Sequence, residues 1–547
     1  MTFQPDPENI RTVNPSSIPQ FPFDSPPRIP ESSAPDYTVQ ADCGVRIPMR
    51  DGVRLAADIY RPSAPGQKFP ALVAVSPYTR QLQQTAIPLG QNEAGITEFW
   101  VPRGYAHVIV DVRGSNDSEG SYDLMGPREQ GDLFDIIEWV AQQPWCSGSV
   151  GMTGCSYFGW SQMMAATQQP PHLKAVFAFD AATDLYRDVC FHGGIFNSGF
   201  ANSWFPALFS LDLRGERLKD PTGILEHARH VLSWEHPFDG PYYRERLSNP
   251  RLDRVRIPVY FVCDWAFYCL HLRGAFEGWA GVGDIPKKML VGPSPRPARP
   301  LGAYHQEALR WYDHHLKGMD TRVREGPPIQ FYIPGLGRWR GEKEWPLGRT
   351  QWQEFYLAGK DGESLRQLLP GKGAEGQGSY RYDPVSPAAR LGQPKLVYRS
   401  EPLEREMEVT GPIALYLNAA SSATDTDWFA SFRDEAPDGS QRELCRGWLR
   451  ASHRELDAER SQPWRPFHPH LASAPLKPGQ AYEYAIELWP TSNLFKAGHR
   501  LRLEIASGDD QSEFMRCHQS LPVPATNTIL EGGRAPSRLL LPVIPSR

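Results

Sequence analysis

The sequence predicts an α/β fold in its first half and a β-rich domain in its second half. Two continuous apolar runs, Phe69–Ser76 and Tyr105–Asp111, are typical of strands buried on both faces of a parallel sheet. A helical pattern follows Asp132, and a further strand, Ala175–Phe179, follows another helix, so strands and helices alternate as in a parallel α/β sheet. After about residue 325, short alternating segments separated by turn residues replace this rhythm, which is typical of an antiparallel sandwich or jelly roll.

The chain is expected to begin with an arm and a hairpin. Residues 1–36 are rich in Pro and Ser and predict an extended arm. Val45–Met49 and Val53–Tyr60 alternate between apolar and polar residues, and the Asp51-Gly52 pair between them favours a tight turn. These two segments therefore predict an antiparallel hairpin ahead of the parallel strands.

The strand signal is interrupted once within the α/β part. Between 186 and 250 aromatic and polar residues dominate, with helical stretches near 200–212 and 223–234, which indicates an inserted helical cap. Strand character resumes at Ile257–Val262 and Lys288–Val291, and a helix follows near 302–317. The predicted organisation is an arm (1–36), an α/β core (37–185 and 251–325), a helical cap (186–250) and a C-terminal sandwich (326–547).

Composition excludes several classes of function. A formal net charge of −5 over 547 residues argues against the clustered basic surface of a nucleic-acid binder. No apolar run approaches the ~18 residues that span a bilayer, and residues 1–6 do not resemble a secretory signal. The eight cysteines are scattered without a CxxC pair, so neither a zinc site nor a disulfide framework is expected. Asp313–His315 lacks partner ligands at useful spacing. We expect a soluble, cytoplasmic enzyme without a metal or cofactor.

One serine carries the strongest chemical signal. Small residues crowd around Ser156 within Gly151–Trp160, as in a strand that ends in a sharp turn, exposes a hydroxyl and enters a helix. The common elbow reads G-x-S-x-G, but Phe158 takes the place of its second glycine and Gly159 follows. A nucleophile is the functional interpretation, and a Gly/Ser-rich loop without chemistry is the alternative.

Three further segments support the nucleophile. Ser76–Thr79 and Asp111–Gly120 each follow a predicted buried strand, and Ala451–Arg454 lies in the β-rich part. With Gly154–Gly159 they resemble the cocaine esterase-like hydrolases and their relatives, the X-prolyl dipeptidyl aminopeptidases and α-amino acid ester hydrolases. That family's elbow reads G-x-S-Y-x-G, which accounts for the displaced glycine. The resemblance covers about residues 40 to 515 and includes the segments Leu309–Gly318 and Asp425–Phe429.

The resemblance implies a serine hydrolase with an α/β-hydrolase core, a helical cap and a C-terminal jelly roll of the galactose-binding-like type. It implies that Ser156 attacks an acyl carbon. The oxyanion would be held by the backbone N–H of Tyr157 and by the hydroxyl of Tyr78. A core-edge aromatic is the alternative for Tyr78, but its position just past the end of a strand favours the functional role.

The sequence departs from the family at the acid and the base. Aligned on its tryptophan, the family's Gly-Trp-Tyr-Asp segment places Phe267 at the aspartate position, and Asp264 is the only nearby carboxylate. The family's histidine, in Gly-Pro-Trp-Ser-His, corresponds to Arg296. Arginine stays protonated and is a very poor base, so another residue has to serve.

Two histidines are candidates for the base. His305, nine residues beyond the family position, is the preferred candidate, with Asp264 orienting it, and His271 is the second. His314 and His315 lie at a helix end, where their charge is favourable, and are expected to be structural. The predicted site is therefore Ser156, His305 and Asp264, with Tyr78 and Tyr157 at the oxyanion.

The predicted activity is hydrolysis of a small-molecule ester or amide through an acyl-enzyme, without nucleic-acid or membrane partners and with homodimerisation left open. One alternative is a catalytically impaired relative that binds a ligand or partner, and another is an X-prolyl-type aminopeptidase. The latter needs an acidic group for the substrate amine, and none is identified in the cap. Aromatic residues of the cap are expected either to line an acyl or aryl pocket or to pack the cap on the core: Phe191, Phe200, Trp204, Phe205 and Trp234.

Overall fold

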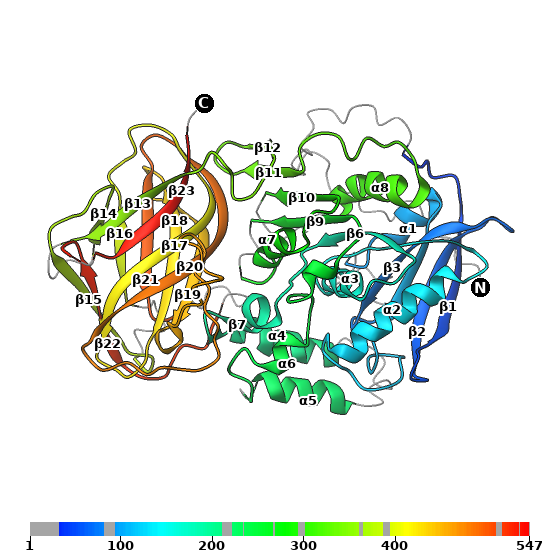
Figure 1. Cartoon of the computed structure of the whole chain (residues 1–547), viewed down its shortest axis with the longest axis horizontal. Coiled ribbons are helices and arrows are strands. Elements are labelled where there is room, and N and C mark those ends of the chain that lie inside the picture. The colour runs from blue at the N-terminus through cyan, green and yellow to red at the C-terminus, as the bar shows by residue number, and fades with distance from the viewer. Residues whose placement is uncertain are drawn as a thin grey trace.

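The predicted fold class is confirmed: an α/β domain with a helical cap precedes a β domain (Figure 1). The computed structural model describes residues 32–80, 93–210, 221–232, 235–265, 269–293, 301–359, 365–386, 394–509, 517–534 and 536–545.

The α/β domain is built on one ten-stranded sheet with the order β1-β2-β4-β3-β5-β6-β9-β10-β11-β12. Its strands from β4 to β11 pair in parallel, while β1, β2 and β12 pair antiparallel at the two edges. The bounds are β1 (Val39–Pro48), β2 (Arg54–Pro62), β3 (Phe69–Ser76), β4 (Ala106–Asp111), β5 (Cys146–Met152), β6 (Leu173–Phe179), β9 (Val259–Asp264), β10 (Lys287–Gly292), β11 (Ile329–Ile333) and β12 (Arg338–Glu342).

Two edges of this sheet bear on the sequence predictions. The predicted hairpin forms, because β1 pairs antiparallel with β2 across the turn at Asp51 and Gly52. At the other edge, β11 and β12 belong to the core sheet, so this sheet extends beyond the predicted boundary at residue 326. The alternating pattern of Ile329–Ile333 does not distinguish an edge strand of the core from a sandwich strand, because both are half-buried.

Helices cover both faces of the sheet. Strand side chains alternate between faces, so Val73 and Val75 pack on one side with α2 and α3, whereas Leu72 packs on the other with α8. The bounds are α1 (Thr97–Trp100), η4 (Val101–Arg103), α2 (Pro127–Ala141), α3 (Tyr157–Gln168), η6 (Leu252–Arg254), α7 (Leu272–Gly281) and α8 (Leu301–Lys317). None of the helices in the described part of the chain is long and apolar enough to cross a membrane.

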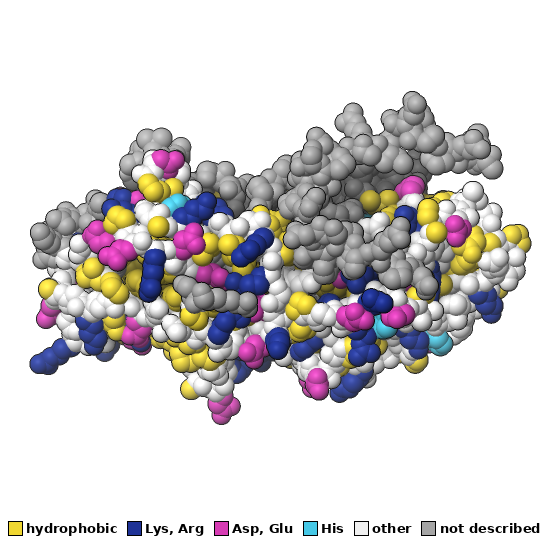
Figure 2. Space-filling view, turned by 90° about the horizontal axis from the view of Figure 1, so that it is seen from above, with side chains coloured by type: hydrophobic (Ala, Val, Ile, Leu, Met, Phe, Trp, Pro, Cys, Tyr) yellow, Lys and Arg dark blue, Asp and Glu magenta, His cyan; other side chains and the backbone are white. Residues whose placement is uncertain are grey.

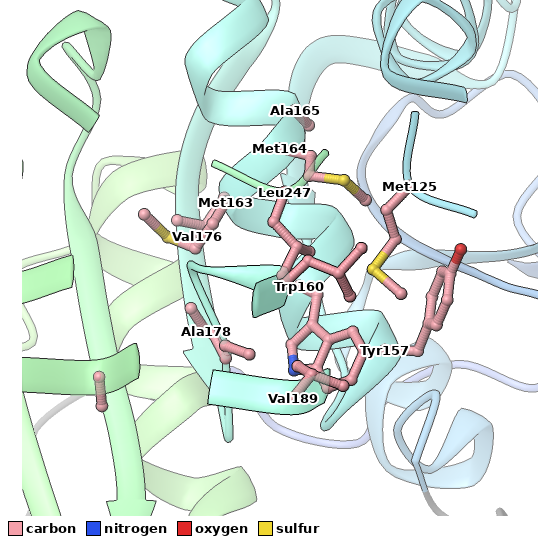
Figure 3. Close-up of a cluster of buried hydrophobic side chains, with 14 of the residues drawn as sticks. Met125, Tyr157, Trp160, Met163, Met164, Ala165, Val176, Ala178, Val189 and Leu247 are labelled. Atoms are coloured by element: carbon pink, nitrogen blue, oxygen red, sulfur yellow. The ribbon is translucent and has the colours of Figure 1, made fainter. Parts of the chain in front are cut away.

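Helix α3 is the most deeply buried helix near the predicted nucleophile. Figure 3 shows Tyr157, Trp160, Met163 and Met164 of this helix among apolar side chains from β6 and from the cap. Eleven of its twelve residues are buried, so its sequence carries little amphipathic signal. Helix α3 is therefore held by packing on all of its sides.

In the described residues, the cap between β6 and η6 consists of short elements and the helices α4, α5 and α6. They are η5 (Leu185–Cys190), β7 (Phe191–His192), β8 (Ile195–Phe196), α4 (Ser198–Ser210), α5 (Pro221–Leu232) and α6 (Pro241–Arg244). Trp204 of α4 stacks on Tyr157 of α3, and β7 and β8 form a small hairpin that reaches the β domain (Figure 1).

The β domain is a jelly-roll sandwich of antiparallel strands, with a parallel pairing between β14 and β16. The long strand β17 pairs with both β20 and β23, which closes the sheet on itself around a core that includes Leu415, Ile486 and Leu503. The bounds are β13 (Gln351–Ala358), β14 (Leu365–Leu369), β15 (Gly376–Tyr382), β16 (Lys395–Arg399), β17 (Met407–Ser421), β18 (Asp427–Glu435), β19 (Gln441–Arg450), η8 (Ala451–His453), β20 (Ala481–Phe495), β21 (Arg500–Ala506), β22 (Ala525–Glu531) and β23 (Arg538–Ile544).

Two buried arginines join the β domain to the rest of the chain. The Arg187 guanidinium pairs with Asp239 at 2.7 Å and donates to the carbonyl oxygen of His468 at 2.9 Å. Arg273 pairs with Asp188 at 2.9 Å and with Glu487 of β20 at 3.3 Å. A buried charge is costly unless it is paired, so each arginine requires partners from both domains.

The outer surface carries mixed charge. On the described part of the face shown in Figure 2, basic and acidic side chains alternate over both domains. The mixture of positive and negative side chains on this face agrees with the small net charge of the chain.

Candidate active site

Ser156 lies at a sharp turn between β5 and α3. Its backbone has φ 62° and ψ −122°, a strained conformation for a residue with a side chain. Two backbone hydrogen bonds hold the turn: Cys155 N–H donates to the carbonyl oxygen of Glu93 at 2.7 Å, and Ser156 N–H donates to that of Phe179 at 3.0 Å. The hydroxyl of Ser156 is thereby fixed at the carboxyl end of the parallel strands, where α/β proteins form their sites.

The two glycines of the motif are required by close contacts. A Cβ atom on Gly154, which has φ 118°, would lie 2.5 Å from the carbonyl oxygen of Glu93. A Cβ atom on Gly159 would collide with the carbonyl oxygen of Phe179 on β6. The displaced glycine therefore lies where the helix backbone approaches the sheet, and Phe158 two residues after the serine is accommodated as a buried side chain.

His271 is the histidine that contacts Ser156. Its Nε2 atom lies 3.5 Å from Ser156 Oγ, within the looser range of catalytic hydrogen bonds in the absence of substrate. The imidazole is buried at the N-terminus of α7 and packs at a tilt against Trp160, with ring centroids 5.7 Å apart. A proton of the Ser156 hydroxyl can pass directly to this nitrogen.

The structure places His305, the preferred base of the sequence analysis, elsewhere. Its Nε2 atom accepts a hydrogen bond from the backbone N–H of Ile96 at 3.0 Å, and its ring stacks on Trp100 with centroids 5.0 Å apart. His305 belongs to α8, which covers the face of the sheet opposite to α3. The prediction of His305 is therefore corrected to His271 on the geometry, because helix α8 carries its histidine away from the elbow.

Asp264, the predicted orienting carboxylate, lies at the carboxyl end of β9, the same edge of the sheet as Ser156. Burial, and after it the charges of Asp264 and Asp180, raises the pKa of Tyr304 well above its usual value. This electrostatic influence places Asp264 near α8, and its orienting role stays a prediction. Phe267 and Arg296, which take the family positions of acid and base, lie outside the described residues.

Two groups next to the elbow are able to donate hydrogen bonds to an oxyanion. Tyr157 is the first residue of α3, where a backbone N–H has no partner within the helix, so it can donate to an oxyanion. The Tyr78 hydroxyl accepts a hydrogen bond from Trp204 Nε1 at 2.9 Å, and a phenol that accepts through its oxygen can also donate. The Tyr78 ring packs edge-on against Tyr157 and Phe158, with both centroid distances 6.1 Å.

A buried ion network braces the loop that carries Tyr78. Arg80 pairs with Asp58 at 3.2 Å, with Asp117 at 3.0 Å and with Asp111 at closer range. Tyr78 N–H donates to Ser76 Oγ at 3.0 Å. Asp111, the last residue of β4, therefore supports this loop.

A second polar group lies under the oxyanion region. Tyr157 donates its hydroxyl to Glu129 at 2.7 Å, and Tyr122 donates to the Tyr157 oxygen at 3.4 Å. Burial raises the pKa of Glu129 to about 8, against hydrogen bonds from Tyr157 and Met125 that lower it. The sequence analysis missed this carboxyl, although Glu129 occupies the apolar stripe of α2 with Leu133 and Val140.

The cap aromatics divide between the two expected roles. Trp204, half-buried, stacks on Phe200 and on Tyr157, with interplanar angles of 19° in both pairs. Phe191 stacks instead on Tyr186 inside the cap, which is a packing role. Phe205 is buried beside Trp204, and Trp234 lies outside the described residues. Trp204 is thus the aromatic side chain that joins the cap to the oxyanion tyrosine.

Comparisons with known proteins show which families the two parts of the chain resemble. The sequence profile of the X-Pro dipeptidyl-peptidase (S15 family) matches residues 51–295, and that of the X-Pro dipeptidyl-peptidase C-terminal non-catalytic domain matches residues 310–540. A cocaine esterase of Rhodococcus sp. (strain MB1 Bresler) is 28% identical over 593 residues, which cover 93% of this chain and 99% of that protein.

Solved structures of other proteins share this fold over most of the chain. A CocE/NonD family hydrolase from Staphylococcus aureus has a TM-score of 0.80 and 25% identity, covering 92% of this chain and 94% of its own. An aminopeptidase from a marine sediment archaeon, Thaumarchaeota archaeon, has a TM-score of 0.74 over 96% of this chain and 99% of its own. Its identity of 20% supports the shared fold alone.

Proposed function

The chain belongs to the S15 family of serine hydrolases, in its cocaine esterase-like branch, and on this premise we propose that it hydrolyses carboxylic esters with His271 as the general base. The single observation that carries the assignment of the base is the 3.5 Å contact between Ser156 Oγ and His271 Nε2. A serine requires such a partner, because its hydroxyl is a weak nucleophile at neutral pH.

The proposed reaction has two halves. Ser156 Oγ attacks the carbonyl carbon while His271 Nε2 takes the hydroxyl proton, and the oxyanion is held by the Tyr78 hydroxyl and the Tyr157 N–H. The bond to the leaving alcohol then breaks, and His271 returns the proton to the alcohol oxygen. Water attacks the acyl-enzyme in the same way, which releases the acid and restores Ser156.

An ester fits the site better than the amine-bearing substrate of an aminopeptidase. Recognition of a free amine requires an anionic group, and Glu129 is the buried carboxyl next to Tyr157. Its pKa of about 8 keeps it neutral at physiological pH, and its oxygens accept from Tyr157 and Met125. Trp204 and Phe200 instead offer aromatic surface beside Tyr78, which favours an apolar acyl or leaving group.

Labelling and turnover test the nucleophile. A fluorophosphonate probe should label the wild type and fail on Ser156→Ala, and this variant should hydrolyse p-nitrophenyl acetate roughly 10⁴–10⁶-fold more slowly. An unlabelled wild type, or an active Ser156→Ala variant, would contradict a serine mechanism.

Substrate class is tested separately. We expect hydrolysis of p-nitrophenyl acetate and p-nitrophenyl benzoate with an initial burst of one p-nitrophenol per chain, because the acyl-enzyme accumulates. Ala-Pro-p-nitroanilide, an aminopeptidase substrate, should be cleaved at least about 100-fold more slowly in kcat/KM. The reverse preference would favour the peptidase activity that gives the family profile its name.

We further propose that the enzyme works in the cytoplasm. All eight cysteines are free thiols, and six of them are buried, which supports a reducing compartment. Fractionation of cells that express the untagged chain would test this localisation.

A further inference from the structure

A cluster of metal-ligating side chains lies on the cap, away from Ser156. His230 near the end of α5 and the following pair Glu235 and His236 each offer one ligand atom, and these three atoms all lie within 4.8 Å of one another. Among the described residues, this is the group of three or more such side chains that could hold a metal ion. The sequence analysis predicted no metal site, because it considered only the cysteine spacing and the segment around Asp313.

The donor set has a defined chemistry. His230 Nδ1 lies 2.5 Å from Glu235 Oε2, and the rings of His230 and His236 have centroids 5.1 Å apart. Two imidazole nitrogens and one carboxylate oxygen are a set that Zn²⁺ accepts, with a solvent molecule as fourth ligand. With Zn–N and Zn–O bonds of about 2.0–2.2 Å, a tetrahedral site separates its ligand atoms by about 3.3 Å. The ligand atoms of His230, Glu235 and His236, within 4.8 Å of one another, therefore need only side-chain adjustment.

The groups around the cluster hold its ligands in place. His230 Nε2 faces Glu226 one helical turn earlier, with 3.6 Å between the nitrogen and Oε1. The second oxygen of Glu235 lies 3.4 Å from Arg229 Nε. Such outer partners orient the imidazole and the carboxylate of metal sites, and here both come from α5 itself.

We propose that His230, Glu235 and His236 form a Zn²⁺ site that fastens the end of α5 to the segment before α6. His236 stacks on Tyr242 of α6 with centroids 4.4 Å apart and an interplanar angle of 10°. Helices α5 and α6 lie side by side in the cap (Figure 1), and the metal joins His230 of α5 to Glu235 and His236, which precede α6. The site is structural, because it makes no contact with Ser156.

A chain of contacts leads from this site toward the oxyanion region. The Tyr242 hydroxyl lies 3.0 Å from His227 Nδ1, and the His227 ring packs edge-on against Tyr122 at 6.1 Å. Tyr122 in turn donates to the hydroxyl of Tyr157. Metal binding should therefore order the cap above the catalytic residues, and binding itself is measured independently of activity.

The experiment titrates Zn²⁺ into the full chain after removal of any histidine tag and of bound metal. We expect one Zn²⁺ per chain with a Kd of about 1 μM or lower and an increase in Tm on binding. His230→Ala and His236→Ala should each weaken binding by at least about 100-fold. Co²⁺ should give the strong visible absorption of a tetrahedral site in the wild type and lose it in both variants.

His172→Ala is the matched control. His172 also pairs with a glutamate, Glu138 at 2.8 Å, but without a second histidine, so its removal should leave Zn²⁺ binding unchanged. Absence of stoichiometric binding to the wild type, or retention of binding by both cap variants, overturns the proposal. If an alanine variant does not fold, Glu235→Gln is measured in its place, and it should also weaken Zn²⁺ binding. This partly exposed side chain can be changed with little cost to packing.

Discussion

The two sides of the catalytic centre are built differently. On the nucleophile side, Ser156 and Tyr78 are fixed by the backbone contacts of Gly154 and Gly159 and by the buried charges around Arg80. On the base side, His271 reaches Ser156 Oγ at 3.5 Å from the start of α7, and the family positions of acid and base hold other residues.

This difference shows which parts of a hydrolase site depend on the backbone. A strained turn and an oxyanion hole require particular residues at particular places, since small displacements remove their function. A general base has only to bring one nitrogen to one hydroxyl. It can therefore come from another loop, provided that the loop ends at the same edge of the sheet.

The largest expected effect separates the two candidate bases. His271→Gln removes the basic nitrogen that contacts Ser156, so kcat for p-nitrophenyl acetate should fall by about 10⁴-fold or more. His305→Gln keeps an acceptor for the Ile96 N–H and should retain kcat within about 3-fold. Stopped-flow or steady-state assays of the two variants check the assignment, and the opposite pattern would restore His305 as the base.

The next effect concerns the oxyanion. Tyr78→Phe removes the side-chain donor while keeping the ring, and kcat should decrease by about 10²–10³-fold with little change in KM. Trp204→Phe removes the N–H that positions the Tyr78 hydroxyl together with part of the ring that stacks on Phe200 and Tyr157, and its decrease should stay at about 10-fold. An unchanged kcat in Tyr78→Phe would show instead that Tyr78 acts only by packing.

A smaller effect is expected from the packing of the elbow. Gly159→Ala places a methyl group against the carbonyl oxygen of Phe179 and should lower the free energy of unfolding by roughly 1–3 kcal/mol. Gly131→Ala is the matched control, because its Cβ meets no atom within 4 Å and alanine favours the helix. Denaturant unfolding of both variants measures the difference, and an unaffected Gly159→Ala would mean that helix α3 can shift away from β6.

The smallest effect depends on pH. Glu129 has its pKa raised from 4.5 to about 8, so the folded state binds more protons than the unfolded state between these values, and stability falls as pH rises through them. Between pH 7 and pH 9 this group should cost the wild type about 1.4 kcal/mol. Glu129→Gln should lose correspondingly less over the same interval in urea unfolding. Parallel pH profiles of the two proteins would show that Glu129 is ionised at neutral pH.

The sequence predicted the parts of the molecule in which residue type and structure are tightly coupled. The parallel strands were visible as apolar runs, and the elbow was visible because Gly154, Ser156 and Gly159 satisfy steric demands. The partner of Ser156 was not predictable in this way. His271 and His305 are both buried histidines near strand ends, and only the side of the sheet on which each helix packs distinguishes them.

Strand β11 illustrates the same limit. Its alternating pattern fits either domain, and only its parallel pairing with β10 in the structure assigns it to the core sheet. Glu129 is a different case, because it could have been found from the sequence. A carboxyl among the apolar positions of a helix is a signal that can be seen without a structure.

The arginines that bridge the two domains have a consequence for protein engineering and for evolution. Arg187 donates to the carbonyl oxygen of His468, and Arg273 pairs with the carboxylate of Glu487. Either domain alone would therefore leave buried polar groups at this interface without their partners. Shuffling the β domain between distant relatives would have to carry the matching arginines along. Recombination within this family should therefore favour crossovers that keep both halves together.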